Sequence, residues 1–219
     1  VMDATDNSLQ PRGKQCFINR SIWYTPVSGI WQTVWLEPVA PAHIENYYVV
    51  SDVDKSTMTI EVDASTSEGD VVKVAVLEGG QGYSAENPSS KVIAEARVQN
   101  GKAEIKIDNM KTWSPDSPYL YGVRLTVTRD GKVVDTVEGY TAMRKISIVK
   151  DKSLNAYHRM ALNNDPLFQF GPLDQGWWPD GLYTAPTDEA LKFDVVKTKE
   201  LGFNMIRKHI KVEPARWYY

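Results

Sequence analysis

Two short stretches near the C-terminal end carry side chains that could bind a polar ligand, and each follows an apolar run. The run LFQF precedes GPLDQGWWPDG, and the run FNMI precedes a basic stretch; together they supply Asp174, Gln175, Trp177, Trp178, Asp180, Tyr183, Arg207, Lys208 and His209. Trp offers a flat surface that stacks against apolar ligand faces, including the C–H face of a sugar, and Asp accepts two hydrogen bonds from vicinal hydroxyls. Arg at a strand end can keep a carboxylate ionised through charge-assisted hydrogen bonds.

The elements that must position these side chains follow the order strand, helix, strand, helix. Leu167–Phe170 and Phe203–Arg207 are short apolar runs that predict strands. Between them, Thr187 is the expected N-cap of a helix that ends at Gly202, and its apolar positions have helical spacing. Glu213-Pro214 is expected to open a second helix. This order predicts parallel strands joined by a right-handed crossover.

Ligands of such folds bind beyond the carboxyl ends of the strands, so we expect both stretches to form one rim. The connection Gly171–Pro186 is longer than the roughly two to six residues that are typical, which favours a functional loop. Purely structural roles for these residues remain open. Trp177 and Trp178 can equally pack in a core, Asp180 can be only a turn residue, and His209 can be a structural hydrogen-bonding group.

Arg207 is expected to pair with a carboxylate. It directly follows an apolar run, and an unpaired guanidinium in such surroundings would be costly.

Residues 42–147 predict an antiparallel, immunoglobulin-like β-sandwich. About seven short strands follow one another, with alternation such as Met58, Ile60 and Val62 in one of them. Asn100-Gly101 and Asp130-Gly131 stand between alternating segments and predict hairpin turns. Cys16 is the only cysteine, so the disulfide between the two sheets of antibody domains is absent. The fold class is therefore expected to be mainly β.

Residues 1–41 contain a further expected strand, because Trp31, Thr33 and Trp35 alternate with their neighbours until Pro38. Few strands fit into this zone, and roughly 40 residues is near the lower limit for independent folding. We expect these residues to be the closing strands of a larger β-domain.

Composition excludes several classes of protein. The 219 residues carry a formal net charge of −3 with interspersed signs, which is unlike a nucleic-acid-binding protein. No run approaches the roughly 18 apolar residues of a membrane helix. No cofactor, metal site or membrane association is expected.

Four motifs, in this order, resemble glycoside hydrolase family 2, the group of β-galactosidases, β-glucuronidases and β-mannosidases. They are SGIWQTVWLEPV, WSPDSPYLYGVRLTV, GYTAMRKISI and LGFNMIRKH. The resemblance implies that residues 1–41 end a jelly-roll sugar-binding domain and that 42–147 form the immunoglobulin-like domain. Residues 148–219 would be the first two βα units of a TIM-barrel catalytic domain, with Arg207 at the end of its second strand.

The resemblance also implies a retaining glycosidase that uses two glutamates, whose carboxyl groups stand roughly 5–5.5 Å apart. The family places both on later barrel strands, and no glutamate here matches either motif, so no catalytic residue is assigned. Arg207 would orient the nucleophile and keep it ionised. Familiar members have a histidine at the position of Ile210, so the sugar and linkage do not follow from the resemblance.

On this reading the chain supplies a scaffold and one rim of a sugar site, and is inactive alone. The expected substrate-binding residues are Asp174, Trp177, Trp178, Asp180, Arg207 and His209, and the expected partner is a carbohydrate. The alternative is a non-catalytic carbohydrate-binding or adhesion module with exposed aromatic residues on the sandwich. Open strand edges invite pairing with another chain, including a homo-oligomer. By analogy with polysaccharide-degrading relatives, the parent protein would be periplasmic or secreted.

Overall fold

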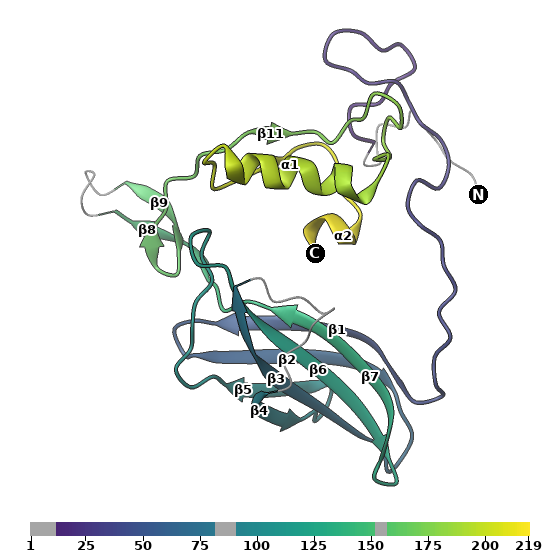
Figure 1. Ribbon diagram of the computed structural model, residues 1–219, viewed down its shortest axis with the longest axis vertical. Helices are drawn as coiled ribbons and strands as arrows, with labels where there is room; N and C mark the ends of the chain where they lie inside the picture. Colours follow the sequence, from purple (N-terminus) through teal and green to yellow (C-terminus); the bar gives the residue numbers. More distant parts are fainter. Residues whose placement is uncertain (1–11, 82–90, 152–156) are drawn as a thin grey trace. The chain divides into compact units, whose positions relative to one another are not determined.

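The computed structural model describes residues 12–81, 91–151 and 157–219, which fall into two compact units (Figure 1). One unit is Glu37–Phe168, and the other combines Gln169–Tyr219 with the segment that ends at Leu36. Strands dominate the described residues and most of them pair antiparallel. The predicted mainly-β class is confirmed.

The unit Glu37–Phe168 contains a β-sandwich of a three-stranded and a four-stranded sheet. Its strands are β1 (His43–Asp52), β2 (Thr57–Ser65), β3 (Val71–Gln81), β4 (Val92–Arg97), β5 (Lys102–Lys106), β6 (Tyr119–Arg129) and β7 (Lys132–Thr141). One sheet has the order β1-β2-β5 and the other β4-β3-β6-β7, with all neighbours antiparallel. This arrangement confirms the predicted immunoglobulin-like sandwich.

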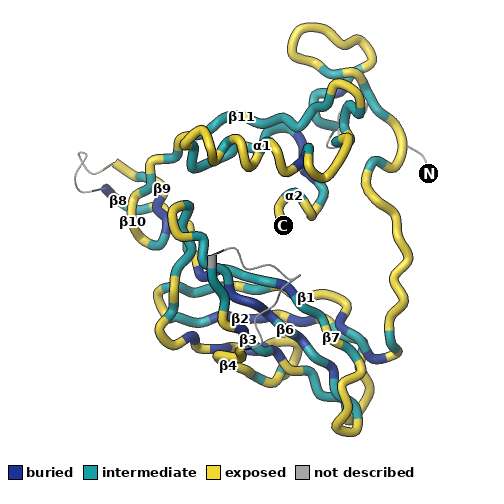
Figure 2. The backbone as a smooth tube through the Cα atoms, viewed as in Figure 1, coloured by how far each residue is buried: buried dark blue, intermediate teal, exposed yellow. Residues whose placement is uncertain are grey.

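The core of the sandwich lies between the inner faces of the two sheets. Buried stretches of the strands are dark blue in Figure 2. Met58 and Ile60 of β2 and Val123 and Leu125 of β6 are fully buried, while Thr59 and Arg124 between them are partly exposed. This is the expected period of two, because successive side chains of a strand point to opposite faces. Burial of each such side chain stabilises the fold by about 2 kcal/mol.

The two predicted hairpin turns form, but one joins paired strands of the same sheet and the other joins strands of different sheets. Asp130 and Gly131 have φ of 50° and 76° and join β6 to β7 through the pair Arg129–Lys132. Asn100 and Gly101 have φ of 51° and 74°, yet β4 and β5 belong to different sheets. The second turn therefore carries only the single bridge Gln99–Lys102 before the strands diverge.

A second, three-stranded antiparallel sheet follows the sandwich within the same unit. It comprises β8 (Ile146–Lys150), β9 (His158–Leu162) and β10 (Asp165–Pro166) in the order β10-β9-β8. Asn163 ties this sheet to the sandwich: its amide donates to the Trp113 carbonyl at 2.9 Å and accepts from the Lys145 N–H at 3.0 Å.

The strand predicted over Trp31–Leu36 is wrong, because residues 30–40 form no strand. A strand exists only where a neighbour satisfies its N–H and C=O groups, and no described residue provides such a ladder for this segment. Trp35 and Leu36 are 70% and 98% exposed instead. The Trp31 ring packs against Tyr183.

In the other unit the predicted helix is confirmed as α1 (Asp188–Glu200). The Thr187 hydroxyl accepts a hydrogen bond from the Ala190 N–H at 3.1 Å, and so caps the first turn. Gly202 follows the helix with φ of 83°, a conformation that favours glycine. A short helix, α2 (Ala215–Tyr218), begins directly after Pro214 as predicted.

Two very short strands, β11 (Leu173–Asp174) and β12 (Arg207–Lys208), pair in parallel. The parallel direction is confirmed, but the predicted bounds, Leu167–Phe170 and Phe203–Arg207, are wrong. The segments already run together at Phe170 and Asn204, which exchange two hydrogen bonds. Pro172 has no N–H to donate, which limits the ladder to the residues after it.

Candidate functional site

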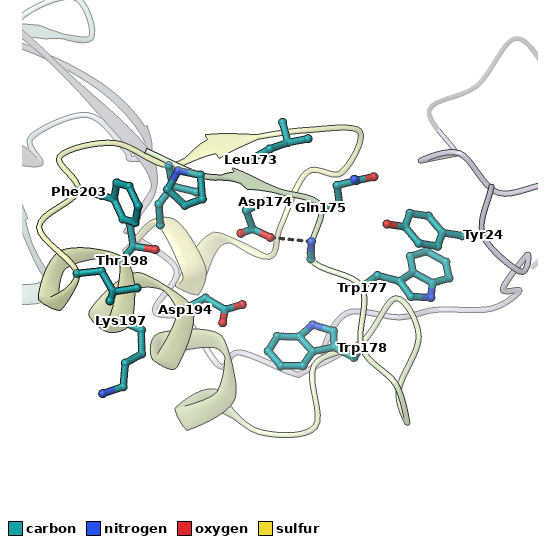
Figure 3. A pocket seen from close by; sticks show the side chains of 14 residues that line it. Tyr24, Leu173, Asp174, Gln175, Trp177, Trp178, Asp194, Lys197, Thr198 and Phe203 are labelled. Carbon is teal, nitrogen blue, oxygen red and sulfur yellow. Dashed lines mark hydrogen bonds between the residues drawn. The ribbon is translucent and has the colours of Figure 1, made fainter. Parts of the chain in front are cut away.

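The carboxyl ends of β11 and β12 lie side by side and form a rim within this unit. The Arg207 N–H donates to the Pro172 carbonyl and the His209 N–H to the Asp174 carbonyl, both at 2.9 Å. Paired residues of neighbouring strands share a face, so Asp174 and Lys208 face one side. Figure 3 shows Asp174 on the side of α1 and Leu173 pointing away from it.

A row of alternating charges, two of them buried and two partly buried, lies behind the rim. The Lys208 ammonium is 2.9 Å from Asp174 Oδ2 and 2.5 Å from Glu213 Oε1. The other Glu213 oxygen, Oε2, is 3.0 Å from the Lys211 ammonium, an ion-pair contact without hydrogen-bond geometry. The side chains of Lys211 and Glu213 are each only 1% exposed. Buried charges are tolerated when each is paired, and this row pairs all four.

Burial and neighbouring charges shift the pKa values of groups around this row. Burial lowers the pKa of the Lys211 ammonium, against the hydrogen bond and charge of Glu213. Burial, reinforced by the charge of Glu213, raises the pKa of Tyr183. Burial, followed by repulsion from Asp174, also raises the pKa of Asp194 on α1. The region is therefore poorly hydrated and electrostatically coupled.

The turn after β11 is fastened to this row at Gly176. Asp174 Oδ1 accepts from the Gly176 N–H at 2.8 Å, and the Lys211 ammonium donates to the Gly176 carbonyl at 2.7 Å. Gly176 has φ of 63°, and a Cβ there would stand 2.1 Å from a Glu213 carboxylate oxygen and 2.6 Å from the Lys208 nitrogen. Only glycine fits without displacing the charged groups.

Trp177 belongs to an aromatic cluster that joins the turn to the N-terminal segment. Its ring stacks on Tyr24, with centroids 4.3 Å apart and planes within 9°. It also meets the edge of Tyr183 at 5.7 Å, and Tyr183 meets Trp31 at 4.6 Å. The Lys211 ammonium lies over the rings of Trp31 and Tyr183, at 5.2 and 4.7 Å. Trp177 was expected either to contact a ligand or to pack in a core, and in the structure its ring packs against Tyr24 and Tyr183.

Trp178 lies next to a cavity of about 500 Å³ that Asp174, Asp194 and Thr198 also line (Figure 3). Its backbone exchanges hydrogen bonds of 2.8 and 2.9 Å with Leu182, which closes the turn containing Asp180. The indole Nε1 is buried and has no hydrogen-bond partner among the described residues. An unpaired buried donor of this kind is rare and marks a place where an acceptor is missing.

The remaining predicted residues have different surroundings. Asp180 is exposed, and its carboxylate accepts from the Gly181 N–H at 3.0 Å, as a turn residue does. His209 is partly buried at the end of β12. Arg207 is exposed, and no carboxylate of the described residues pairs with it, so the pairing expected from the sequence stays a prediction. Its strand partner Leu173 faces away from the buried charges, so Arg207 points to the other side.

Sequence reasoning missed Tyr24, Lys211 and Glu213, which help to hold the rim together. It named Tyr183 and Lys208 only as side chains that could bind a polar ligand, and not as residues that position the rim. The spacing of Lys208, Lys211 and Glu213 gave a signal, since three charges follow an apolar run closely. Glu213 was interpreted only as the start of a helix. Which of two adjacent cations points inward depends on strand register, and spacing alone does not fix it.

Groups of His, Cys, Asp or Glu that could hold a metal ion are absent from the described residues. Within those same ranges, no helix has the length and apolar character needed to cross a membrane.

Comparisons with known proteins find a family match for the sandwich and similar proteins that cover most of the chain. Residues 42–144, which span the sandwich, match the sequence profile of glycosyl hydrolases family 2. A β-galactosidase of Thermoanaerobacter pseudethanolicus is 27% identical over 197 residues, which cover 84% of this chain and 24% of that protein. A β-galactosidase of Streptococcus thermophilus is 26% identical over 197 residues, which cover 87% of this chain and 18% of the relative.

Solved structures show the same fold. A β-glucuronidase of Ruminococcus gnavus in complex with D-glucuronic acid superposes with a TM-score of 0.62 at 20% identity, over 81% of this chain and 28% of that one. The predicted resemblance to glycoside hydrolase family 2 is thereby confirmed, and the family match lies on the sandwich. It spans about a quarter or less of the length of the curated relatives that it matches.

The crowding at Gly176 gives a prediction about stability. Gly176→Ala should lower the melting temperature of the unit, because the methyl group displaces Lys208 and Glu213. Gly202→Ala is the matched control: it also has positive φ, 83°, but nothing lies within 4 Å of its Cβ. Thermal unfolding followed by tryptophan fluorescence should show the larger loss for Gly176→Ala. Equal losses would mean that backbone conformation alone matters and that the charged row is not crowded.

Proposed function

We propose that this chain is a segment of a retaining glycoside hydrolase that cleaves β-glycosidic bonds in oligo- or polysaccharides. The observation that carries the proposal is the match to proteins named β-galactosidase, which covers 84% and 87% of the chain and so extends over both units. A further relative, from Formosa agariphila, is named a putative β-glucuronidase and is 22% identical over 97% of this chain. These names favour β-linked sugars without fixing which one.

The proposed organisation keeps the three segments that the sequence suggests. Residues 1–41 end a jelly-roll sugar-binding domain, 42–147 are the immunoglobulin-like domain, and 148–219 open the catalytic barrel. The succession β11, α1, β12, α2 with parallel strands supports the last assignment. The sandwich then acts as a scaffold, and the rim at the ends of β11 and β12 contributes to the sugar site.

Within this rim we assign the six expected substrate-binding residues to two roles, direct contact with the sugar and support of the turn that makes the contact. Trp178 and Asp180 on the turn, with Arg207 and His209 after β12, lie at or beyond the carboxyl ends of the strands, where ligands of such folds bind. Asp174 and Trp177 shape the same turn from behind, through Gly176 and through Tyr24.

The chemistry requires a nucleophile and an acid, each a carboxyl group free to reach the anomeric carbon. Asp174 and Glu213 come nearest to such a pair, since both bind Lys208. The ammonium occupies the space between them, so a sugar cannot enter there. We therefore place both catalytic glutamates outside this chain, and assign to the exposed Arg207 guanidinium the task of keeping the nucleophile ionised.

The first test is an assay of the 219-residue chain with aryl β-glycosides. We expect no turnover above the buffer rate, because the two catalytic carboxyl groups are not among its residues. Release of the aryl group is followed by absorbance. Turnover that a single Glu→Gln change within residues 1–219 abolishes would overturn this assignment.

A second test concerns Arg207 in the complete enzyme. Arg207→Ala should lower kcat/KM by about a hundredfold or more, the size of effect seen when one charge-stabilising donor is lost at an active site. Arg97→Ala is the control, because Arg97 is an exposed arginine on β4 of the sandwich. Steady-state kinetics of both variants give the kcat/KM values to be compared with that of the wild type. An Arg207→Ala enzyme with near-wild-type kinetics would remove Arg207 from the site.

A second candidate function is non-catalytic carbohydrate binding by the sandwich. One observation favours it: Tyr48 is 67% exposed beside a hollow of about 260 Å³ that Asn46, Glu61, Asp63 and Asn100 line. An exposed ring among hydrogen-bonding groups suits a sugar. The two candidates differ in the effect of Tyr48→Ala, which would abolish sugar binding by the chain in the second and leave hydrolysis by the complete enzyme unchanged in the first.

A further inference from the structure

The row of charges connects to the candidate substrate contacts through a single residue, Gly176. We propose that Lys208 and Glu213 are positioning residues of the sugar site, which act through Asp174 and Lys211 to fix the Gln175–Trp178 turn. This inference rests on the proposed function for its substrate, although the geometry behind it does not. Neither side chain touches the rim surface itself.

The first arm of the connection starts at Lys208 and passes through Asp174. Both carboxylate oxygens of Asp174 are engaged: Oδ2 with the Lys208 ammonium at 2.9 Å, and Oδ1 with the Gly176 N–H at 2.8 Å. The backbone carbonyl of Asp174 accepts from His209. Asp174 therefore has little hydrogen-bonding capacity left for a substrate, and its orientation depends on Lys208.

The second arm starts at Glu213 and passes through Lys211. Glu213 binds Lys208 through Oε1 and Lys211 through Oε2, and the Lys211 ammonium donates to the Gly176 carbonyl at 2.7 Å. The Gly176 residue is thus held at its N–H by one arm and at its C=O by the other. The direction in which the chain enters Trp177 and Trp178 follows from these two contacts.

The surroundings shield half of the row from water. Lys211 and Glu213 are nearly inaccessible to water, and the rings of Trp31 and Tyr183 cover the Lys211 ammonium. Loss of Glu213 would leave the Lys211 ammonium buried without a counter-ion, and loss of Lys208 would leave Asp174 without one, which forces the side chains to rearrange. Gly176, which both arms hold, would move with them. Displacement of a substrate-contacting group by about 1 Å can cost a hundredfold in rate.

The test is Lys208→Met and Glu213→Gln in the complete enzyme, assayed with an aryl β-glycoside at a temperature at which every variant is folded. We expect KM to rise by about tenfold or more with a smaller change in kcat, because the turn contributes ground-state binding. Lys208→Arg keeps the charge and should restore most of the loss. Lys55→Met is the control, since Lys55 forms an exposed pair with Asp52 at 3.2 Å.

Two results would overturn the inference. One is a KM within about twofold of wild type in both variants, and the other is a lowered melting temperature with unchanged kinetics, which would indicate a structural role alone. If the wild-type enzyme hydrolyses no β-glycoside, the proposed function fails instead. The positioning role is then read from ¹⁹F NMR of 5-fluorotryptophan protein. The Trp178 resonance, assigned with Trp178→Phe, should shift in Lys208→Met but not in Lys55→Met, and an unshifted resonance would refute the role.

Discussion

The pairing of four charges, of which Glu213 and Lys211 are buried and Asp174 and Lys208 partly buried, is the constraint on which the candidate site depends. Isolated, any one of them would be costly away from water; in alternation, each satisfies its neighbour. The row crosses from β11 to β12 and on toward α2, and therefore joins segments that very short strands hold only weakly. Two residues of ladder in each strand provide little hydrogen bonding, so charge pairing and ring stacking supply the order at the rim.

Each of the two units is stabilised internally by a different kind of interaction. The sandwich depends on the non-directional burial of residues such as Met58 and Leu125 between two sheets. The rim depends on directional contacts, in which the position of each group is set by a specific partner. A site that must orient sugar hydroxyls benefits from the second arrangement, since fixed partners restrict the rotamers of the groups around them.

Much of the fold could be predicted because its signals are local. The alternation in β2, the Asp130-Gly131 turn and the Thr187 cap each require only a few neighbouring residues to be recognised. The Trp31–Leu36 strand failed because a strand needs a partner, which no local pattern supplies. The bounds of β11 shifted because Pro172 and the contact between Phe170 and Asn204 decide where the ladder begins.

The position of the candidate site was predicted from the sequence, but the contacts between its residues were not. Residues of the expected types do follow both strands, because the order of elements places their carboxyl ends together. The choice between Arg207 and Lys208 as the inward cation was not predictable, since a one-residue change of register exchanges the two faces of a strand. Trp177 and Trp178 likewise look alike in the sequence, and only the stacking on Tyr24 separates the packed ring from the one beside the cavity.

The most direct measurement is a crystal structure of the complete enzyme with a sugar-derived inhibitor in its active site. The central claim predicts that the ligand lies over the rim next to Trp178. It also predicts that the Arg207 guanidinium is about 2.7–2.9 Å from the carboxylate of a glutamate outside residues 1–219. A ligand bound away from the ends of β11 and β12, with Arg207 in solvent and far from any glutamate, would contradict the account.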